Sequence, residues 1–235
     1  MAVPFFYISE YDGQPLVELE EEAARHIVQV LRMKEGEKLH LTDGKGKLLF
    51  CEIQATGKKF CTVRVDKSTL QTAPERKVSI AISLVKNPSR FEWFLEKATE
   101  IGVSEIIPLI CSRTEKERFR HDRMNAICIS AMLQSQQVWL PVLHEPVKFE
   151  DMGKWKSEKG INLIAHCEQG DKSGLQHFHI STASHLLICI GPEGDFTPDE
   201  IALALKEGFQ PVSLGNTRLR TETAGIVAAS LLINS

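Results

Sequence analysis

The chain has 235 residues, of which 43% are hydrophobic and 25% are charged, a mixture typical of globular proteins. This composition excludes a disordered, collagen-like or disulfide-scaffold chain. The formal net charge of -3 gives no overall sign of a nucleic-acid partner, but the charge is unevenly distributed. Residues 1–22 carry six acids and no Lys or Arg, whereas residues 25–67 carry ten Lys or Arg and five acids. This local basic excess fits either a polyanionic partner or an ordinary solvated surface.

The first 70 residues are predicted to form a small β-barrel or sheet with one helix. Acids crowd the start of residues 18–33 and cations their end, and apolar side chains recur at helical spacing, which predicts a helix that stops at Gly36. Glycine-containing turns at 43–46 and 56–58 should join the last three strands as hairpins. The expected strands are 5–9, 38–43, 47–56 and 59–68.

A polar stretch at 71–77 is predicted to be a linker between domains at 1–70 and 78–235. After it, apolar strands alternate with helices, which predicts an α/β domain with a parallel sheet covered by helices. The expected strands are 78–85, 103–110, 161–168, 185–191 and 211–215. The expected helices are 90–101, 120–137, 197–208 and 221–234.

Two of these helices begin with capping signals. Ser89 and Glu92 have the spacing of a capping box, which should open the helix at 90–101. Thr197, followed by proline and by Glu200, is a strong helix start. The helix at 221–234 is apolar almost all round, so it should be buried, within the domain or against another subunit.

Cysteine usage and hydropathy bear on where the protein works. No Cys-x-x-Cys pair occurs among the six cysteines, so neither a zinc ribbon nor a redox motif is indicated. The closest histidine pair, His177 and His179, has no cysteine nearby. The first residues do not resemble a signal peptide, and no run approaches the roughly 18–20 apolar residues that span a bilayer. We therefore expect a cytoplasmic protein that uses no metal and no membrane.

Two glycine-bearing loops follow apolar strands and are candidates for a ligand site. One is the sequence GPEG at 191–194, and the other is LGNTRLRTETA at 214–224. Ligands bind beyond the carboxyl ends of parallel strands, and glycine lets the backbone approach a ligand closely. The same residues could instead form a simple tight turn and a loop that leads into a helix. The absence of Gly-x-Gly-x-x-Gly and Walker A motifs counts against a classical dinucleotide or nucleotide fold.

These loops carry a resemblance to a known family. The sequences LICIGPEGDFTPDEI (187–201) and SLGNTRLRTETA (213–224) resemble the paired signature of SPOUT-class methyltransferases, specifically the ribosomal RNA small subunit methyltransferase E family. HIVQVLRMKEG (26–36) with LHLTDGKG (39–46) resembles the PUA-like RNA-binding domain of that family. LVKNPSRFEWFLEKATEIGVSEIIPL (84–109) fits its first α/β helix, so the resemblance covers nearly the whole chain.

The resemblance implies both a fold and an activity. It implies a C-terminal SPOUT-type α/β domain with a deep trefoil knot, and a small N-terminal PUA-like β-barrel domain. It also implies a homodimer whose cofactor sites lie in the knot, close to the partner subunit. The implied cofactor is S-adenosylmethionine, and the implied reaction is methylation of N3 of a specific uridine in 16S ribosomal RNA of the small subunit.

The loops and the resemblance together give candidate site residues. Arg220, at the rim of the second loop, would stabilise the anionic form of the base, and Glu222 is a second candidate catalytic residue. Arg220 could instead form an ion pair with Glu222, and Glu193 could also act as the base. The candidate cofactor-binding residues are His166, Gly191, Pro192, Glu193, Gly194, Leu214, Gly215, Leu219, Thr223 and Ala224.

RNA binding would use cations of the first domain and of the junction that follows it. Each cation by itself could be an ordinary surface charge, but together they could neutralise phosphates. The target base would need to leave its stack to reach the cofactor. The candidate RNA-binding residues are Arg25, Arg32, Lys34, Lys45, Lys47, Lys58, Lys59, Arg90 and Arg113.

The chain departs from the family pattern in two places. Asp195 stands where the family often has a second glycine, and residues 133–137 (LQSQQ) stand where it often has Glu-Gln…Gly-Arg. If that family arginine holds RNA, its role is vacant at Gln137 or has moved to Arg113, Arg118 or Arg120. The departures leave two alternatives open: a noncatalytic RNA-binding factor in ribosome assembly, and a SPOUT methyltransferase that acts on another RNA.

Overall fold

The computed structural model describes residues 3–168, 172–175, 178 and 183–234. The chain forms two compact units, Met1–Ala73 with Met132–Leu140, and Pro74–Ala131 with Pro141–Ser235. Residues 132–140 therefore pack with the N-terminal unit, whereas the sequence predicts a second domain that runs unbroken over 78–235. The linker at 71–77 stays a prediction.

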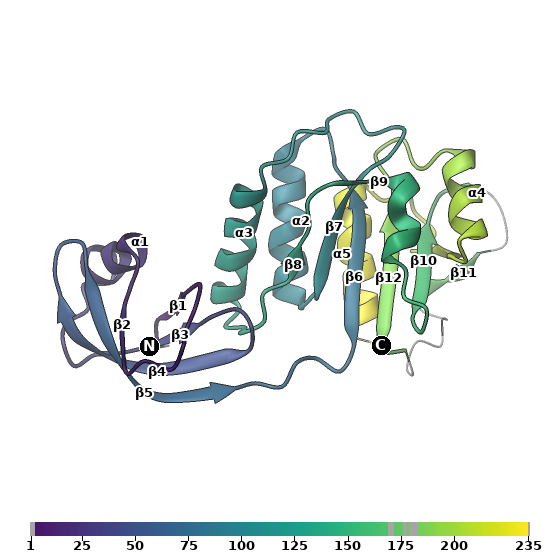
Figure 1. The fold of residues 1–235 in the computed structure, drawn as a ribbon. Coiled ribbons are helices and arrows are strands. Elements are labelled where there is room, and N and C mark those ends of the chain that lie inside the picture. The colour runs from purple at the N-terminus through teal and green to yellow at the C-terminus, as the bar shows by residue number, and fades with distance from the viewer. Residues whose placement is uncertain (1–2, 169–171, 176–177, 179–182, 235) are drawn as a thin grey trace. The chain divides into compact units, whose positions relative to one another are not determined.

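The N-terminal unit is built on a five-stranded sheet with the order β1-β3-β4-β5-β2 (Figure 1). Both predicted hairpins are confirmed, because β3 pairs with β4 and β4 with β5 in antiparallel register. The strand β2 was not predicted, and it pairs antiparallel with β5 although 42 residues separate their ends. The strands are β1 (Phe5–Tyr7), β2 (Leu16–Glu18), β3 (Lys38–Thr42), β4 (Lys47–Thr56) and β5 (Cys61–Leu70).

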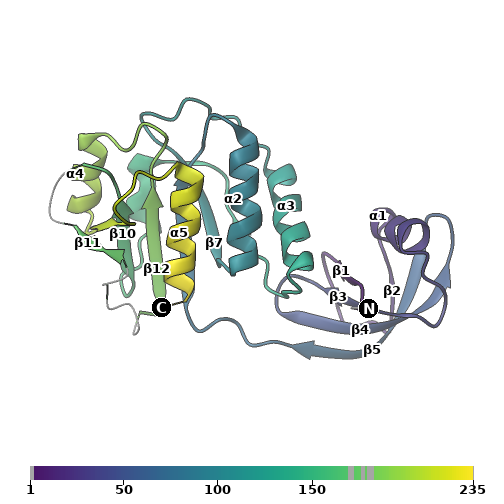
Figure 2. The same ribbon diagram turned by 180° about the vertical axis from the view of Figure 1, so that it is seen from behind.

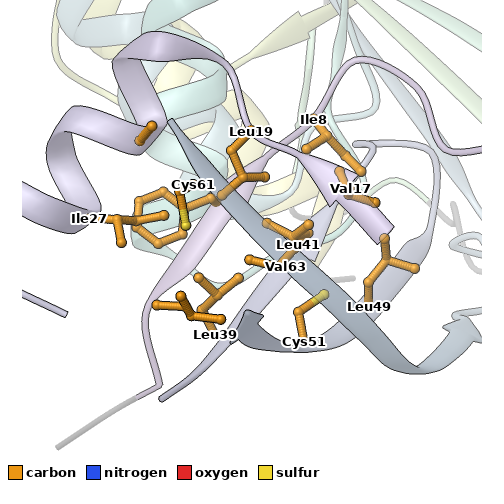
Figure 3. Packing of buried hydrophobic residues seen from close by; sticks show 13 residues of the cluster. Ile8, Val17, Leu19, Ile27, Leu39, Leu41, Leu49, Cys51, Cys61 and Val63 are labelled. Atoms are coloured by element: carbon orange, nitrogen blue, oxygen red, sulfur yellow. The ribbon is translucent and has the colours of Figure 1, made fainter. Parts of the chain in front are cut away.

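Alternate residues of these strands supply one hydrophobic core. Leu39 and Leu41 of β3 share one buried cluster with Cys51 of β4 and Val63 of β5, and Leu41 and Val63 lie at its centre (Figure 3). Ile27, from the helical segment that covers the sheet, is fully buried in the same cluster. This period-two burial is what the alternating pattern of the strands predicts.

The helical segment of this unit differs from its prediction. In place of one helix over 18–33, the structure has the short helix α1 (Glu21–Arg25), which continues as a π-helix, η1 (His26–Val30). Leu19 lies outside the helix, and its backbone N–H donates to Cys61 O at the start of β5. The segment ends at Arg32, whose φ of 54° lies in the left-handed region, so it stops before Gly36.

The second unit contains a parallel sheet with the order β11-β13-β10-β12-β6-β7-β8, with β9 pairing with β7. Every pair of these strands is parallel, which confirms the predicted α/β architecture. The short strands β8, β9 and β11 were not predicted. The strands are β6 (Lys77–Ser83), β7 (Glu105–Ile110), β8 (Val142–Leu143), β9 (Val147–Lys148), β10 (Ile161–Ala165), β11 (Ser173–Gly174), β12 (His185–Ile190) and β13 (Gln210–Ser213).

Helices cover both faces of this sheet. α2 and α5 lie side by side on one face, and η2 and α4 lie on the opposite face (Figures 1 and 2). Gly225 lets α5 approach closely, because a Cβ there would lie 2.6 Å from the ring of Phe94 on α2. The helices are α2 (Pro88–Ile101), α3 (His121–Gln134), the 3-10 helix η2 (Phe149–Trp155), α4 (Pro198–Lys206) and α5 (Thr221–Ile233). Among the described residues, no helix has the length and hydropathy needed to cross a membrane.

The two predicted helix starts have different outcomes. Thr197 caps α4 with both hydrogen bonds of a capping box, as predicted from Glu200. The prediction that Ser89 caps α2 was wrong, because the side chain of Asn87 accepts the hydrogen bond from Ser89 N. Pro88 suits the first turn, where no backbone donor is required, so the helix begins two residues earlier than predicted.

Candidate active site

A pocket of about 510 Å³ opens at the carboxyl ends of β10, β12 and β13. β10 lies between β13 and β12 in the sheet, so the loops that follow β12 and β13 flank the end of β10. The two loops, though about 20 residues apart in sequence, therefore face each other across residues 165–167. The pocket is lined by Ala165, His166, Cys167, Lys172, Ile190, Gly191, Pro192, Glu193, Asp195, Val212, Ser213, Leu214, Gly215, Asn216, Thr217, Arg218, Leu219, Arg220, Thr221 and Ala224.

The structure brings most of the predicted cofactor residues together in this lining. Those in it are His166, Gly191, Pro192, Glu193, Leu214, Gly215, Leu219 and Ala224, joined by the predicted catalytic residue Arg220. Gly194 and Thr223 are neighbours of lining residues but are not part of the wall. Glu222 also lies outside the wall.

Asp195 ties the loop after β12 to the end of β10. Its φ of 64° is left-handed, a region that Asp tolerates better than most residues. One carboxylate oxygen accepts a hydrogen bond from Cys167 N at 2.7 Å, and the other accepts from Phe196 N at 2.8 Å. The residue that departs from the family pattern is therefore a cross-link between two walls of the pocket.

Three further side chains tie the same loop to other elements. Arg113, after β7, donates to Gly194 O at 2.6 Å and to Phe196 O at 3.3 Å. Thr221, at the start of α5, donates to Gly191 O at 2.9 Å. The side chain of Glu193 accepts from Lys86 N, after β6, at 3.0 Å. The loop is thus fixed before any ligand arrives, which lowers the entropic cost of binding.

The second loop supplies glycine backbone and two arginines. Gly215 has a φ of 137°, a conformation that side-chain-bearing residues rarely adopt, and nothing lies within 4 Å of the position of a Cβ. Arg218 and Arg220 are both exposed and both line the pocket. Neither guanidinium forms an ion pair with any described residue, so both are available to a ligand.

Glu222 is buried and paired with a residue other than Arg220. Its side chain is 8% exposed, and Oε1 lies 3.7 Å from Nε of Arg90 on α2. Oε2 is buried and has no hydrogen-bond partner among the described residues. The alternative of an Arg220–Glu222 ion pair is therefore wrong for this structure, and Arg90, a predicted RNA contact, is the cation beside Glu222.

His166 places an unpartnered polar atom in the pocket wall. Its Nδ1 is buried and has no hydrogen-bond partner among the described residues. Burial lowers the pKa of the imidazole, and the nearby Lys172 lowers it further, while Asp195 and Glu168 act in the opposite direction. The Lys172 ammonium donates to His166 O at 2.8 Å and also to Glu168 O. At neutral pH His166 is therefore a neutral group that still lacks one hydrogen bond.

Sequence reasoning missed several residues of the pocket wall. Cys167 and Lys172 follow the strand at 161–165, and no motif in the sequence there indicates a ligand site. Asp195 could have been identified, because it departs from the family pattern next to a loop that is already a candidate ligand site. Arg218 lies two residues before Arg220 in the same loop, so it could have been found by the same reasoning.

The predicted RNA-binding cations fall into two groups. Five are engaged: Arg25 and Lys59 with Glu21, Lys47 with Tyr11 O and Asp43, Arg90 with Glu222, and Arg113 with the loop after β12. Four have no ion pair among the described residues: Arg32, Lys34, Lys45 and Lys58. The second group is free to neutralise phosphates, and its role in RNA binding stays a prediction.

No group of His, Cys, Asp and Glu residues that could hold a metal ion occurs in the described part of the chain. His177 and His179, the pair considered from the sequence, lie outside the described residues.

Comparison with known proteins assigns both units. Residues 72–233 match the family described as an RNA methyltransferase domain, and residues 19–66 match the RNA methyltransferase PUA domain. A probable rRNA methyltransferase from Porphyromonas gingivalis has a similar structure, with a TM-score of 0.89 and 36% sequence identity over 97% of this chain and 95% of that one. The fold and the pocket thus define an RNA methyltransferase with a PUA domain.

More specific relatives narrow the class. Ribosomal RNA small subunit methyltransferase E of Mesomycoplasma hyopneumoniae is 31% identical over 69% of this chain and 71% of its own length. The enzyme of the same name from Neisseria gonorrhoeae, solved bound to S-adenosylmethionine, has a TM-score of 0.87 and 28% identity over 97% of this chain and 96% of that one. The chain belongs to the ribosomal RNA small subunit methyltransferase E family.

Proposed function

We propose that this protein transfers the methyl group of S-adenosylmethionine to N3 of a specific uridine in 16S ribosomal RNA of the small subunit. The observation that carries the proposal is the pocket that both glycine-bearing loops line, with Arg220 on its wall. The related enzyme from Neisseria gonorrhoeae binds the same cofactor, which supports the assignment.

The residues of the pocket fit this cofactor. A volume of about 510 Å³ lies within the usual range of small-molecule sites. Leu214, Leu219 and Ala224 are partly exposed and offer apolar surface to an adenine ring, and the glycine backbones of 191 and 215 allow close approach. The unpartnered Nδ1 of His166 would gain the hydrogen bond that it lacks.

The chemistry asks the protein mainly for alignment and charge. The bound cofactor supplies an activated methyl group, so the chain must hold the base in line with it. Loss of the uridine N3 proton leaves negative charge on the base, and the unpaired Arg220 would stabilise that charge. Glu193, which lines the pocket, and the buried Glu222 are the two candidates to accept the proton.

The family resemblance also suggests a knotted chain and a homodimer. Along α5 the apolar side chains Ile226, Val227 and Leu231 remain partly exposed, and Trp93 on α2 is exposed as well. α2 and α5 lie side by side (Figure 2). We propose that a second copy of the chain covers this apolar face, so sedimentation should give twice the mass of one chain. The proposed site of action is the cytoplasm, where ribosomal RNA is modified.

A transfer assay tests the proposed function. Purified protein is incubated with labelled S-adenosylmethionine and with small ribosomal subunits that lack the modification, and the labelled nucleotide is identified by mass spectrometry. Label on N3 of one uridine is the expected result. Label in transfer RNA instead would indicate another RNA substrate, and cofactor-free RNA binding without label would indicate a noncatalytic assembly factor.

The variant Arg220→Ala tests the role of the guanidinium. Loss of a group that stabilises developing charge typically lowers kcat by about 100-fold or more. We expect that loss with the Kd of S-adenosylmethionine, measured by calorimetry, unchanged within about twofold. Arg218→Ala is the matched control on the same wall, with a smaller effect on kcat. Loss of cofactor binding in Arg220→Ala would assign Arg220 a structural role.

A further inference from the structure

The N-terminal unit exposes large apolar side chains beside its cations. Val30 is 68% exposed and Leu31 is 42% exposed, and both follow the fully buried Ile27 on the helical segment. Phe60, in the turn between β4 and β5, is 44% exposed. Exposed apolar groups of this size that lie together on a basic protein surface mark an interaction site more often than a random scatter.

The helical segment and the β4–β5 turn are adjacent. Gln29 Nε2 donates to Lys58 O at 3.3 Å, and the Lys59 ammonium lies 3.2 Å from the Glu21 carboxylate. Both views of the fold show α1 beside the tip of the β4–β5 hairpin (Figures 1 and 2). We use the name Phe60 surface for the residues Val30, Leu31, Arg32, Lys58 and Phe60.

The helical part of the Phe60 surface has two unusual backbone features, a π-helix and a left-handed residue. The π-helix η1 shifts the end of the helical segment, and Leu31 N donates to His26 O rather than to the residue four positions back. Arg32 then adopts a φ of 54°. π-helices and left-handed non-glycine residues both cost free energy, and both occur frequently at functional sites.

The β4–β5 turn fixes the aromatic ring. Gly57 N donates to Phe60 O at 3.0 Å, and the ring lies over Gly57 so closely that a Cβ there would be 2.1 Å from ring carbon Cε1. The ring is therefore held in place with one part open to solvent. A pre-positioned aromatic ring loses little conformational entropy when a flat group stacks on it.

The charges indicate which partner the surface fits. Arg32 and Lys58 have no ion pair among the described residues, whereas Arg25 and Lys59 both share Glu21. Unpaired cations next to an exposed aromatic ring are the combination that binds single-stranded nucleic acid, with phosphates on the cations and a base on the ring. A protein partner with an apolar face would leave these cations unused.

We propose that the Phe60 surface binds an unpaired nucleotide of the RNA substrate, with the base stacked on Phe60 and the flanking phosphates on Lys58 and Arg32. The proposal rests on the proposed function, because it names a contact for the same RNA. It adds an aromatic position for base stacking to a unit whose predicted RNA contacts are all cations.

The affinity of the full-length protein for a labelled single-stranded oligouridylate, measured by fluorescence anisotropy, tests the proposal. We expect Phe60→Ala to weaken binding about tenfold, in the range known for loss of one stacked base. Phe60→Tyr should bind within about twofold of the native chain, and Phe60→Leu should be as weak as Phe60→Ala. Leu70→Ala, at a residue of the same unit that is 72% exposed, is the matched control and should change nothing.

Salt dependence tests the phosphate contacts separately. Lys58→Ala should lower the slope of log Kd against log salt by about 0.7, the value for one phosphate on a single strand. Native affinity in Phe60→Ala, full rescue by Phe60→Leu, or no binding of the oligouridylate by the native chain would each overturn the proposal. If oligouridylate binding depends on Phe60 but the native chain transfers no methyl group, the surface stands and the proposed function fails.

Discussion

At the amino end of the C-terminal sheet, every buried polar group of one cluster has a partner, whereas at the carboxyl end two buried polar atoms have none. The cluster centres on Glu105 at the start of β7, which accepts from Ser79 at 2.6 Å, from His144 at 2.8 Å and from Lys77 at 2.9 Å. At the other end, His166 Nδ1 and Glu222 Oε2 lack a hydrogen bond among the described residues.

The difference separates stability from binding. A buried carboxylate with three donors stabilises the fold, because the three hydrogen bonds together compensate for the desolvation of its charge. An unpartnered buried atom costs stability and is retained where a ligand supplies the missing bond. The amino end of the sheet thus stabilises the fold, and the carboxyl end of the same strands binds a ligand.

Breaking the Glu105 cluster should give the largest loss of stability. In Glu105→Gln the charge is lost while the size is kept, so the free energy of unfolding should fall by about 2–3 kcal/mol. Because the cluster lies at the end of the sheet opposite the pocket, the Kd of S-adenosylmethionine should stay the same for the folded variant. Denaturant unfolding and calorimetry measure the two quantities. If Glu105→Gln bound S-adenosylmethionine more weakly but kept native stability, the cluster would serve binding and not stability.

The pH dependence of stability follows from the same cluster. Burial raises the pKa of Glu105, but hydrogen bonds from Lys77, Ser79 and His144 lower it more, so the folded value lies below the ordinary 4.5. A lowered carboxyl pKa contributes stability that is present above the unfolded value and lost as pH falls through the folded one. Acid unfolding of the native chain below about pH 4.5 should therefore be steeper than that of Glu105→Gln.

At the pocket end, Asp195→Gly should weaken cofactor binding. Glycine suits the left-handed backbone, but the variant loses the acceptors for Cys167 N and Phe196 N. We expect about a tenfold weaker Kd for S-adenosylmethionine and a net loss of about 2 kcal/mol of stability. Asp195→Asn keeps one acceptor, so its Kd and its stability should lie between those of the native chain and those of Asp195→Gly. Native affinity in Asp195→Gly would mean that the cross-link does not shape the pocket.

Substitutions in the turns that end three helices should give the smallest effects, with opposite signs. α2, α3 and α4 all end in the same motif, whose left-handed residue is Gly102, Gln136 and Gly208 respectively. Gln136→Gly should raise the free energy of unfolding by about 0.5–1 kcal/mol, and Gly208→Ala should lower it by about 1 kcal/mol. Neither should change the Kd of S-adenosylmethionine. A destabilised Gln136→Gly would show that its side chain makes a contact that the structure does not contain.

Local signals predicted local structure well. The capping box of Thr197, the two hairpins of the N-terminal unit and the presence of the apolar strands all follow from residues close in sequence. The strand β2 could not be predicted, since Leu16–Glu18 is a strand only through its pairing with β5. The π-helix η1 was not predicted either, because the apolar spacing of residues 23–31 fits an ordinary α-helix.

The pocket shows what the sequence could and could not indicate. The two loops were identified from glycine and from a family signature, and the structure places both on one pocket. The order of the strands could not be predicted from the sequence, so His166 was the only candidate site residue from the third wall at 165–167. The engagement of Arg90 with Glu222 and of Arg113 with the loop after β12 also depends on tertiary contacts. Surface cations in a sequence therefore cannot be separated into free and engaged ones.

A crystal structure of the protein soaked with S-adenosylhomocysteine tests the central claim most directly. The account predicts ligand density between residues 191–194 and 214–220, with a hydrogen bond to His166 Nδ1 and with the sulfur on the side of Arg220. An empty pocket at saturating ligand, or a ligand bound elsewhere on the chain, would contradict it.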